Sequence, residues 1–242
     1  NINNAITSFM VVINDFAKSN YFKDALAGLR AAYVSIAKVG EYLAIVNALP
    51  QVSISRAEQD SLTYNTAFMK FAEGNYGVAK TTFHQYLSNF KEGIFSLEAN
   101  YYLAESCVKL KDTTCAIGHF DFVVKANQKN LEAANLYLAR HYFSLNDFEN
   151  SNSYYQNLEK IATNNSVKRE AIIRLMLGFE NKANQQSDLY AGKALSLDKI
   201  DDGLKNRASV ILARSYFNQG NFQKAEKTFS ILNTTDRVGA EA

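Results

Sequence analysis

Proline and glycine are scarce in this sequence, and tryptophan is absent. The 242 residues include a single proline, Pro50, and 11 glycines, whereas 47% of the residues are hydrophobic. Folds built from many short strands need turn residues about every 8 to 12 positions, so a composition this poor in turn formers excludes them. It favours long helices joined by short turns, in a chain long enough to bury a sizeable core.

Neither sign of charge dominates, and no long apolar run is present. The 26 Lys and Arg residues against 24 Asp and Glu residues leave a formal net charge of +2. Such a balance lacks the basic surplus that nucleic-acid binding usually requires. No apolar stretch approaches the roughly 18 residues that span a bilayer. We therefore expect neither a nucleic-acid partner nor a membrane-spanning segment in this chain.

Cysteine and histidine are too few to indicate a metal or redox centre. Cys107 and Cys115 lack the paired spacing of a zinc site and are too few for a disulfide framework. Two buried free thiols are favoured over a disulfide, because unpaired cysteine behaves mostly as a small hydrophobe; the oxidation state is left open. His84, His119 and His141 have no partner at a spacing such as His-Glu-x-x-His and are interpreted as ordinary helix residues. We expect no metal and no cofactor.

Catalytic motifs are also missing. The sequence has neither a glycine-rich phosphate loop nor a Gly-x-Ser-x-Gly turn. The adjacent carboxylates Asp201 and Asp202 precede a helical stretch, where acidic side chains cap exposed amides and suit the helix dipole. We interpret them as a helix cap rather than as an acid–base pair. The sequence therefore predicts a protein that is not an enzyme.

An internal repeat organises the chain. Segments 67–83 and 213–229 share a small residue, an aromatic helix end, Gly-Asn-aromatic, and then Ala and Phe four positions apart. The small residue after the turn recurs at intervals of 37, 35, 36 and 38 residues, at Ala79, Ala116, Ser151, Ser187 and Ala225. A period of this length corresponds to two helices and two turns per repeat.

Each part of the repeat has a physical role. Ala or Ser at the marker position lets two helices approach to about 8 to 10 Å, and the aromatic residue that follows fills the adjacent groove. Gly-Asn after a helix permits the left-handed C-cap conformation that ends it. Because one helix pair leaves an apolar face exposed, the pairs must stack.

The repeat frame divides the chain into a truncated first repeat and six helix pairs. Residues 1–16 parallel the second helix of a later repeat, so we interpret them as a second helix whose first helix is missing, within a longer protein. We predict a single domain over residues 1–242. Its helix pairs are expected at 20–49, 54–90, 94–127, 130–162, 165–197 and 201–232.

These motifs resemble the tetratricopeptide repeat (TPR) family, whose signature is a small residue in the first helix, Gly-Asp/Asn-Tyr/Phe at the turn and Ala-x-x-x-Phe in the second helix. The resemblance covers nearly the whole chain. It is strongest around Gly74 and Gly220 and weakest over 165–197, and the family's early tryptophan and late proline are absent. It implies an all-α, right-handed superhelical solenoid of antiparallel helix pairs that acts as a protein–protein interaction scaffold.

A linker resembles those of bacterial cell-envelope TPR proteins. The phrase Phe-x-x-Gly-x-Phe-x-x-Glu-Ala runs from Phe90 to Ala99 and has an echo from Phe16 to Ala25. The resemblance implies a scaffold that is periplasmic or associated with the outer membrane of a bacterium, with the cytoplasm as the alternative compartment.

The partner-binding surface is expected on the first helix of each pair, which lines the concave face of a TPR stack. By register this face comprises Tyr64, Phe68, Tyr101, Glu105, Leu136, Arg140, Ile172, Met176, Val210 and Arg214. The alternative is that these residues pack between repeats or face solvent. Tyr64, Phe68 and Tyr101 are predicted to form one contiguous aromatic patch.

The chemistry of this face indicates what kind of partner it holds. It offers Tyr, Phe, Leu and Glu where a clamp for a peptide's terminal carboxylate needs Lys, Arg and Asn. We therefore expect other proteins or peptide segments as partners, held as a helix or extended strand by apolar and mixed-charge contacts. The alternative function is a structural spacer within a long solenoid whose activity lies elsewhere.

Overall fold

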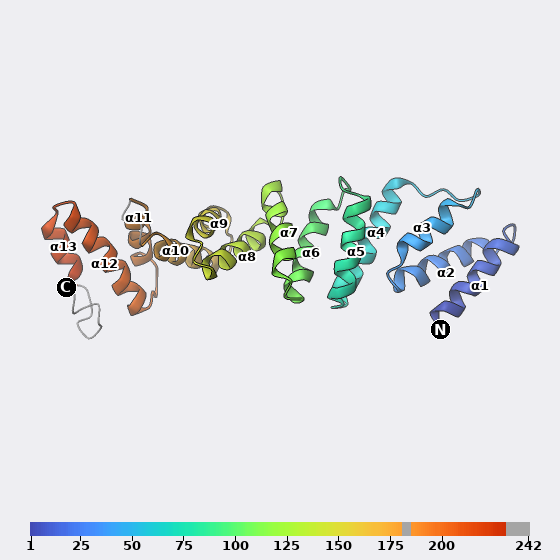
Figure 1. Ribbon diagram of the computed structural model, residues 1–242, viewed down its shortest axis with the longest axis horizontal. Helices are drawn as coiled ribbons and strands as arrows, with labels where there is room; N and C mark the ends of the chain where they lie inside the picture. Colours follow the sequence, from blue (N-terminus) through green and yellow to red (C-terminus); the bar gives the residue numbers. More distant parts are fainter. Residues whose placement is uncertain (181–184, 231–242) are drawn as a thin grey trace. The chain divides into compact units, whose positions relative to one another are not determined.

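The computed structural model describes residues 1–180 and 185–230, and their secondary structure is helical throughout, joined by short turns. The chain forms two compact units, Asn1–Lys129 and Asn130–Ala242. Within each unit, every helix lies beside the one before it (Figure 1). The prediction of an all-α chain of sequential antiparallel helix pairs is confirmed.

The first unit contains seven helices among its described residues, and the second contains six among its own. Unit 1 comprises α1 (Ile2–Asp15), α2 (Phe22–Ser35), α3 (Val39–Asn47), α4 (Arg56–Ala72), α5 (Tyr76–Asn89), α6 (Ser96–Lys109) and α7 (Thr113–Ala126). Unit 2 comprises α8 (Leu131–Ser144), α9 (Phe148–Ile161), α10 (Asn165–Phe179), α11 (Gln185–Leu195), α12 (Asp202–Asn218) and α13 (Phe222–Phe229). The turn expected at 182–184 and the end of the last pair at 231–232 lie outside the described residues. We call the even-numbered helices from α2 onward first helices and their successors second helices.

The marker residues of the repeat are buried at every copy. The exposed fraction is 0% or 3% in each case, for Ala79, Ala116, Ser151, Ser187 and Ala225. Of the aromatic residues four positions after them, Phe83, Phe120 and Tyr155 are buried as well, and Phe229 is half-buried. Small side chains at these positions therefore let paired helices pack closely, as the sequence predicts.

The turns within pairs combine two local devices. Gly74 and Gly220 have φ angles of 76° and 75°, the left-handed conformation expected at the end of the preceding helix. The asparagine that follows each glycine then caps the next helix, because Asn75 accepts from the backbone N–H of Val78, and Asn221 makes the equivalent bond.

Copies without glycine keep the same turn. Lys111 and Asn146 take φ angles of 59° and 57°, and the caps that follow them are Asp112 and Asp147. Asp201 caps α12 by accepting from the backbone N–H of Leu204, which confirms the interpretation of this carboxylate as a helix cap. No described helix combines the length and apolar character needed to cross a membrane.

A buried carboxylate ties three consecutive helices of unit 1 together. Asp60 on α4 accepts a 2.7 Å hydrogen bond from the Tyr86 hydroxyl on α5. Its other oxygen accepts from the backbone N–H of Ile94, just before α6. Because Asp60 and Tyr86 are both buried, the polar atoms satisfy one another inside the stack instead of facing water.

The two cysteines form a disulfide, so the expectation of free thiols is wrong. Cys107 near the end of α6 and Cys115 near the start of α7 are bonded, with their Cα atoms 5.9 Å apart. The left-handed turn at Lys111 reverses the chain between them. This reversal brings residues eight positions apart to a separation that suits a disulfide.

Candidate functional site

A groove of about 550 Å³ runs between α2 and α4, which are successive first helices of unit 1. It is lined by Lys23, Leu26, Ala27, Arg30, Ala31 and Val34 from α2, Tyr42 from α3, and Leu62, Asn65, Thr66 and Met69 from α4. A second hollow of about 410 Å³ shares five of these residues and extends the groove to the start of α4 and the linker at Val52 and Ile54. We call this surface the α2/α4 groove.

The sequence of α2 explains the open floor of the α2/α4 groove. Lys23, Ala27, Arg30 and Ala31 recur at spacings of three and four residues, so they share one face of the helix. All four are exposed, and the two alanines leave room because their side chains end at Cβ. The face of α2 is therefore a shallow channel with a basic residue at Lys23 and another at Arg30.

The basic side chains beside this channel form no ion pair with any described residue, although Arg30 lies close enough to Glu58, which lines the extension of the groove, to help lower the pKa of that carboxyl. Among the residues that the structure describes, Lys23 and Arg30 form no hydrogen bond or ion pair. Across the channel, Asn65 presents an exposed side-chain amide, and Met69 is half-buried one helical turn further on. The groove thus combines apolar surface, two exposed basic side chains and an exposed amide that can both donate and accept a hydrogen bond.

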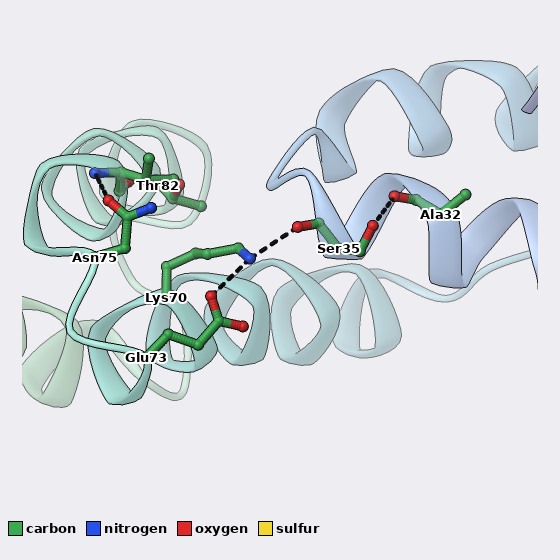
Figure 2. Close-up of polar contacts among 7 residues, drawn as sticks. Ala32, Ser35, Lys70, Glu73, Asn75 and Thr82 are labelled. Atoms are coloured by element: carbon green, nitrogen blue, oxygen red, sulfur yellow. Dashed lines mark hydrogen bonds and ion pairs between the residues drawn. The ribbon is translucent and has the colours of Figure 1, made fainter. Parts of the chain in front are cut away.

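A buried lysine holds the two walls of the α2/α4 groove together (Figure 2). Lys70 on α4 donates a 2.8 Å hydrogen bond to the backbone carbonyl of Ser35 at the end of α2, and it also binds the Glu73 carboxylate. The last carbonyls of a helix have no partner within the helix, so Lys70 supplies one from the neighbouring repeat. Its sequence neighbour Met69 lines the groove, and so does Val34, which precedes Ser35.

Unit 2 has a comparable groove of about 770 Å³ between the first helices α8 and α10. Its lining comprises Arg140, Phe143, Ser144, Tyr155, Ser166, Arg169, Glu170, Ile173 and Arg174. Unlike the basic residues on α2, Arg140 in this groove has an ion-pair partner. Arg140 binds Glu170 through both Nε and Nη2, at 2.8 and 2.5 Å, and the Tyr155 hydroxyl donates to the same carboxylate. The hydrogen bonds from Arg140 lower the pKa of Glu170.

At two positions a groove is lined by the residue that follows the predicted one. Asn65 and Ile173 line the grooves, whereas the prediction placed the residues before them, Tyr64 and Ile172, on the open side. One position along an α-helix is a rotation of about 100°, enough to move a side chain from a groove into the packing between helices. Arg140 is a predicted residue that does line a groove.

The structure buries three of the predicted partner-binding residues. Met176 has an exposed fraction of 0% and belongs to the core of unit 2, and Tyr64 and Val210 are each 8% exposed. Their side chains pack between helices, where burying apolar surface stabilises the fold. Tyr101, Glu105, Leu136 and Ile172 are half-buried, and Phe68 and Arg214 are exposed. Partner contact stays a prediction at all ten predicted positions.

The aromatic residues between α4 and α6 form a packed cluster with a member that the sequence did not single out. Tyr64 stacks on Phe95 with ring centroids 4.4 Å apart, and Phe68 lies 4.9 Å from Tyr102. Tyr102 also contacts Tyr101 at 5.3 Å, so it links the three predicted aromatics. Burial raises the pKa of Tyr101 to about 12. The cluster joins one repeat to the next.

Sequence reasoning missed a second polar cluster in unit 1. His84 on α5 and His119 on α7 have ring centroids 5.5 Å apart, and the side-chain ligand atoms of His84, His119 and Cys115 all lie within 4.8 Å of one another. Burial lowers the pKa of both imidazoles, that of His119 to about 4. Cys115 and His119 are four residues apart on one helix, and this spacing is the signal that could have found them.

Comparisons with known proteins agree with the repeat pattern at the end of the chain. A family model described as "Tetratricopeptide repeat" matches residues 207–234. No curated protein matches the chain in sequence.

The comparison with solved structures also finds similar chains. A tetratricopeptide repeat protein from Parabacteroides merdae has 14% identity, coverage of 94% of this chain and 78% of that chain, and a TM-score of 0.46. MamA from Desulfovibrio magneticus has 14% identity, coverage of 74% and 94%, and a TM-score of 0.44. A TPR repeats protein from Bacteroides fragilis has 16% identity, coverage of 100% and 99%, and a TM-score of 0.40.

Proposed function

We propose that the chain is a tetratricopeptide repeat scaffold that binds a partner polypeptide in the α2/α4 groove, and the family model that matches residues 207–234 supports this. Repeat scaffolds of this family are generally protein-binding and typically non-catalytic. Stacked helix pairs present extended surfaces because each pair contacts only its neighbours. The α2/α4 groove is the part of that surface in unit 1 whose shape and charge specify an occupant.

The observation that carries the proposal is a pair of exposed basic side chains without ion-pair partners among the described residues, Lys23 and Arg30, beside an apolar floor. Arg30 and Lys23 flank a channel whose floor includes Leu26 and Leu62. Complementary charge selects partners and steers their approach, while apolar contacts supply most of the binding free energy. We therefore assign the groove to a short segment that carries carboxylates beside large apolar side chains. Asn65 is placed to hydrogen-bond the backbone of that segment.

Selection from a random peptide library tests this assignment. Peptides enriched on the parent protein should combine Asp or Glu with Leu, Ile or Phe. Their affinity should fall about tenfold or more in Arg30→Glu, since a charge pair at a desolvated rim is replaced by like-charge repulsion. Lys91→Glu makes the same charge change at an exposed residue that does not line the groove, and it should leave the affinity unchanged.

Two results would count against the groove. If no peptide is enriched, the spacer function is favoured instead. If Arg30→Glu and Lys91→Glu weaken binding equally, the effect comes from net charge and not from this site.

A cell-envelope location is proposed on the resemblance of the linker, and the disulfide supports it. Disulfides persist in oxidising compartments such as the periplasm and are rare in the cytosol. Alkylation of free thiols in intact producing cells should therefore leave Cys107 and Cys115 unmodified. Complete alkylation of both without a reductant would contradict this location.

A further inference from the structure

Three potential metal ligands converge from the second helices α5 and α7 of unit 1. His84 comes from α5, and Cys115 and His119 project from one face of α7. Ligands around a tetrahedral Zn²⁺ lie roughly 3.3 to 3.8 Å apart, given bonds of about 2.0 to 2.3 Å. The three ligand atoms already lie within 4.8 Å of one another, so side-chain rotations alone can bring them to that spacing.

A buried amide orients one of these imidazoles. The Oδ1 atom of Asn100 lies 2.7 Å from Nδ1 of His119, and the amide nitrogen of Asn100 donates to the backbone carbonyl of Ser96. The bond to Ser96 leaves Oδ1 as the atom that faces the ring, so Nδ1 of His119 carries the proton. Nε2 then keeps its lone pair. A hydrogen bond of this kind to the second ring nitrogen is the usual companion of a metal-bound histidine.

The third ligand is withheld by the disulfide, because the sulfur of Cys115 is bonded to that of Cys107. We propose that His84, His119 and Cys115 form a Zn²⁺ site that becomes available when this disulfide is reduced. One thiolate and two imidazoles are a donor set that suits Zn²⁺. Cys107 controls the site, because the disulfide between Cys107 and Cys115 removes the thiolate ligand.

The chemistry of the switch balances with a dithiol as the reductant. The dithiol gives two electrons and two protons, the S–S bond of the protein breaks to two thiols, and the dithiol becomes a cyclic disulfide. Zn²⁺ then replaces the proton of Cys115, which leaves to solvent, and bonds to the sulfur and to one nitrogen of each imidazole.

The surroundings of Cys115 combine a helix N-terminus with an ion pair. The residue lies in the first turn of α7, where the helix dipole stabilises negative charge. Its backbone N–H donates to the carboxylate of Asp112, which is also paired with Lys80 at 2.6 Å. A carboxylate oxygen of Asp112 lies within 4.8 Å of the Cys115 sulfur, and its ion pair with Lys80 balances its charge.

Titration of the whole chain with Zn²⁺ tests the site. The protein is used oxidised, or reduced with a dithiol that is then removed under anaerobic conditions. Reduced protein should bind one Zn²⁺ per chain about 100-fold more tightly than oxidised protein, because metal affinity follows the available thiolate. With Co²⁺ as the probe, the reduced protein alone should show thiolate-to-metal absorption.

Substitutions distinguish the role of Cys107, which controls the site, from the role of the metal ligands. Cys107→Ser leaves Cys115 unpaired and should bind Zn²⁺ without reduction, whereas Cys115→Ser and His119→Gln should not bind under either condition. Asn100→Ala should weaken binding about 10- to 100-fold, and Asn100→Asp, which keeps an acceptor, should restore it. His141→Gln is the matched control and should bind like the parent. Circular dichroism verifies that each variant remains helical.

Three outcomes would overturn the proposal. Oxidised and reduced protein could bind Zn²⁺ equally, or the reduced protein could bind none at micromolar concentration. Alternatively, folded Cys115→Ser could bind as tightly as reduced parent protein.

Discussion

Lys70 donates a hydrogen bond of 2.8 Å to the backbone carbonyl of Ser35, and this bond joins the first helix of one repeat to the first helix before it. The side chain of Lys70 is only 10% exposed, whereas that of its second partner, Glu73, is 48% exposed. Stacked repeats depend on interfaces of this kind, since each pair is stabilised mainly by its neighbours. A buried cation that reaches across such an interface fixes the spacing of the groove beside it.

Replacing Lys70 by Met should therefore destabilise unit 1 by about 1 to 3 kcal/mol, because a hydrogen bond from a charged donor is lost while the apolar stem is kept. Glu73→Gln removes only an exposed ion-pair partner and should change the stability by less than about 1 kcal/mol. Chemical denaturation of both variants measures the difference. If both substitutions lower the free energy of unfolding equally, the hydrogen bond to Ser35 does not contribute to stability.

Tyr64 tests whether the aromatic cluster is packing or a binding surface. Because Tyr64 is 8% exposed and stacks on Phe95, Tyr64→Ala should cost about 3 to 5 kcal/mol, the usual range for truncating a large buried aromatic side chain. Tyr101→Ala, at a half-buried position, should cost less. Thermal melting and peptide affinity are measured on the same proteins. If Tyr64→Ala melts like the parent but binds the peptide more weakly, Tyr64 belongs to the binding surface.

The pair of Arg140 and Glu170 should make part of the stability of unit 2 depend on pH. Hydrogen bonds from Arg140 hold the pKa of Glu170 below its ordinary value of 4.5. A carboxyl whose folded pKa is depressed contributes stability above its unfolded pKa and loses it as the pH falls toward the folded value. The parent should therefore lose more stability between pH 5 and pH 3 than Glu170→Gln does. Denaturation of both proteins across this range measures the effect, and parallel curves would contradict it.

The fold could be predicted from the sequence because its determinants are local. The turn residue Gly74 and the cap Asn75 act within a few positions of their place in the chain. Ala79 is small where the helices of its pair meet, and its exposed fraction is 0%. Such features recur at a constant period, and so the repeat could be recognised without knowledge of any contact between distant residues.

The candidate sites depend on geometry that a repeat frame does not carry. On α4, Asn65 lines the groove, whereas the predicted Tyr64 is buried and the predicted Phe68 is exposed. Spacing alone does not resolve the rotation of about 100° between neighbouring positions. The disulfide follows from the left-handed turn at Lys111. His84 on α5 lies close to His119 on α7 only because α5 packs beside the next repeat, and this contact is between residues far apart in the sequence.

Photo-crosslinking from the α2/α4 groove tests the proposed function most directly. A photoreactive phenylalanine analogue replaces Ala31, which is exposed in the groove, or Ala48, which is exposed outside it, in the cells that produce the protein. The account predicts that Ala31 crosslinks to one defined protein, at a segment that combines acidic and large apolar residues, and that the Arg30→Glu change removes this product. Crosslinks that are the same from Ala31 and Ala48, or no product from Ala31 in protein that melts like the parent, would contradict it.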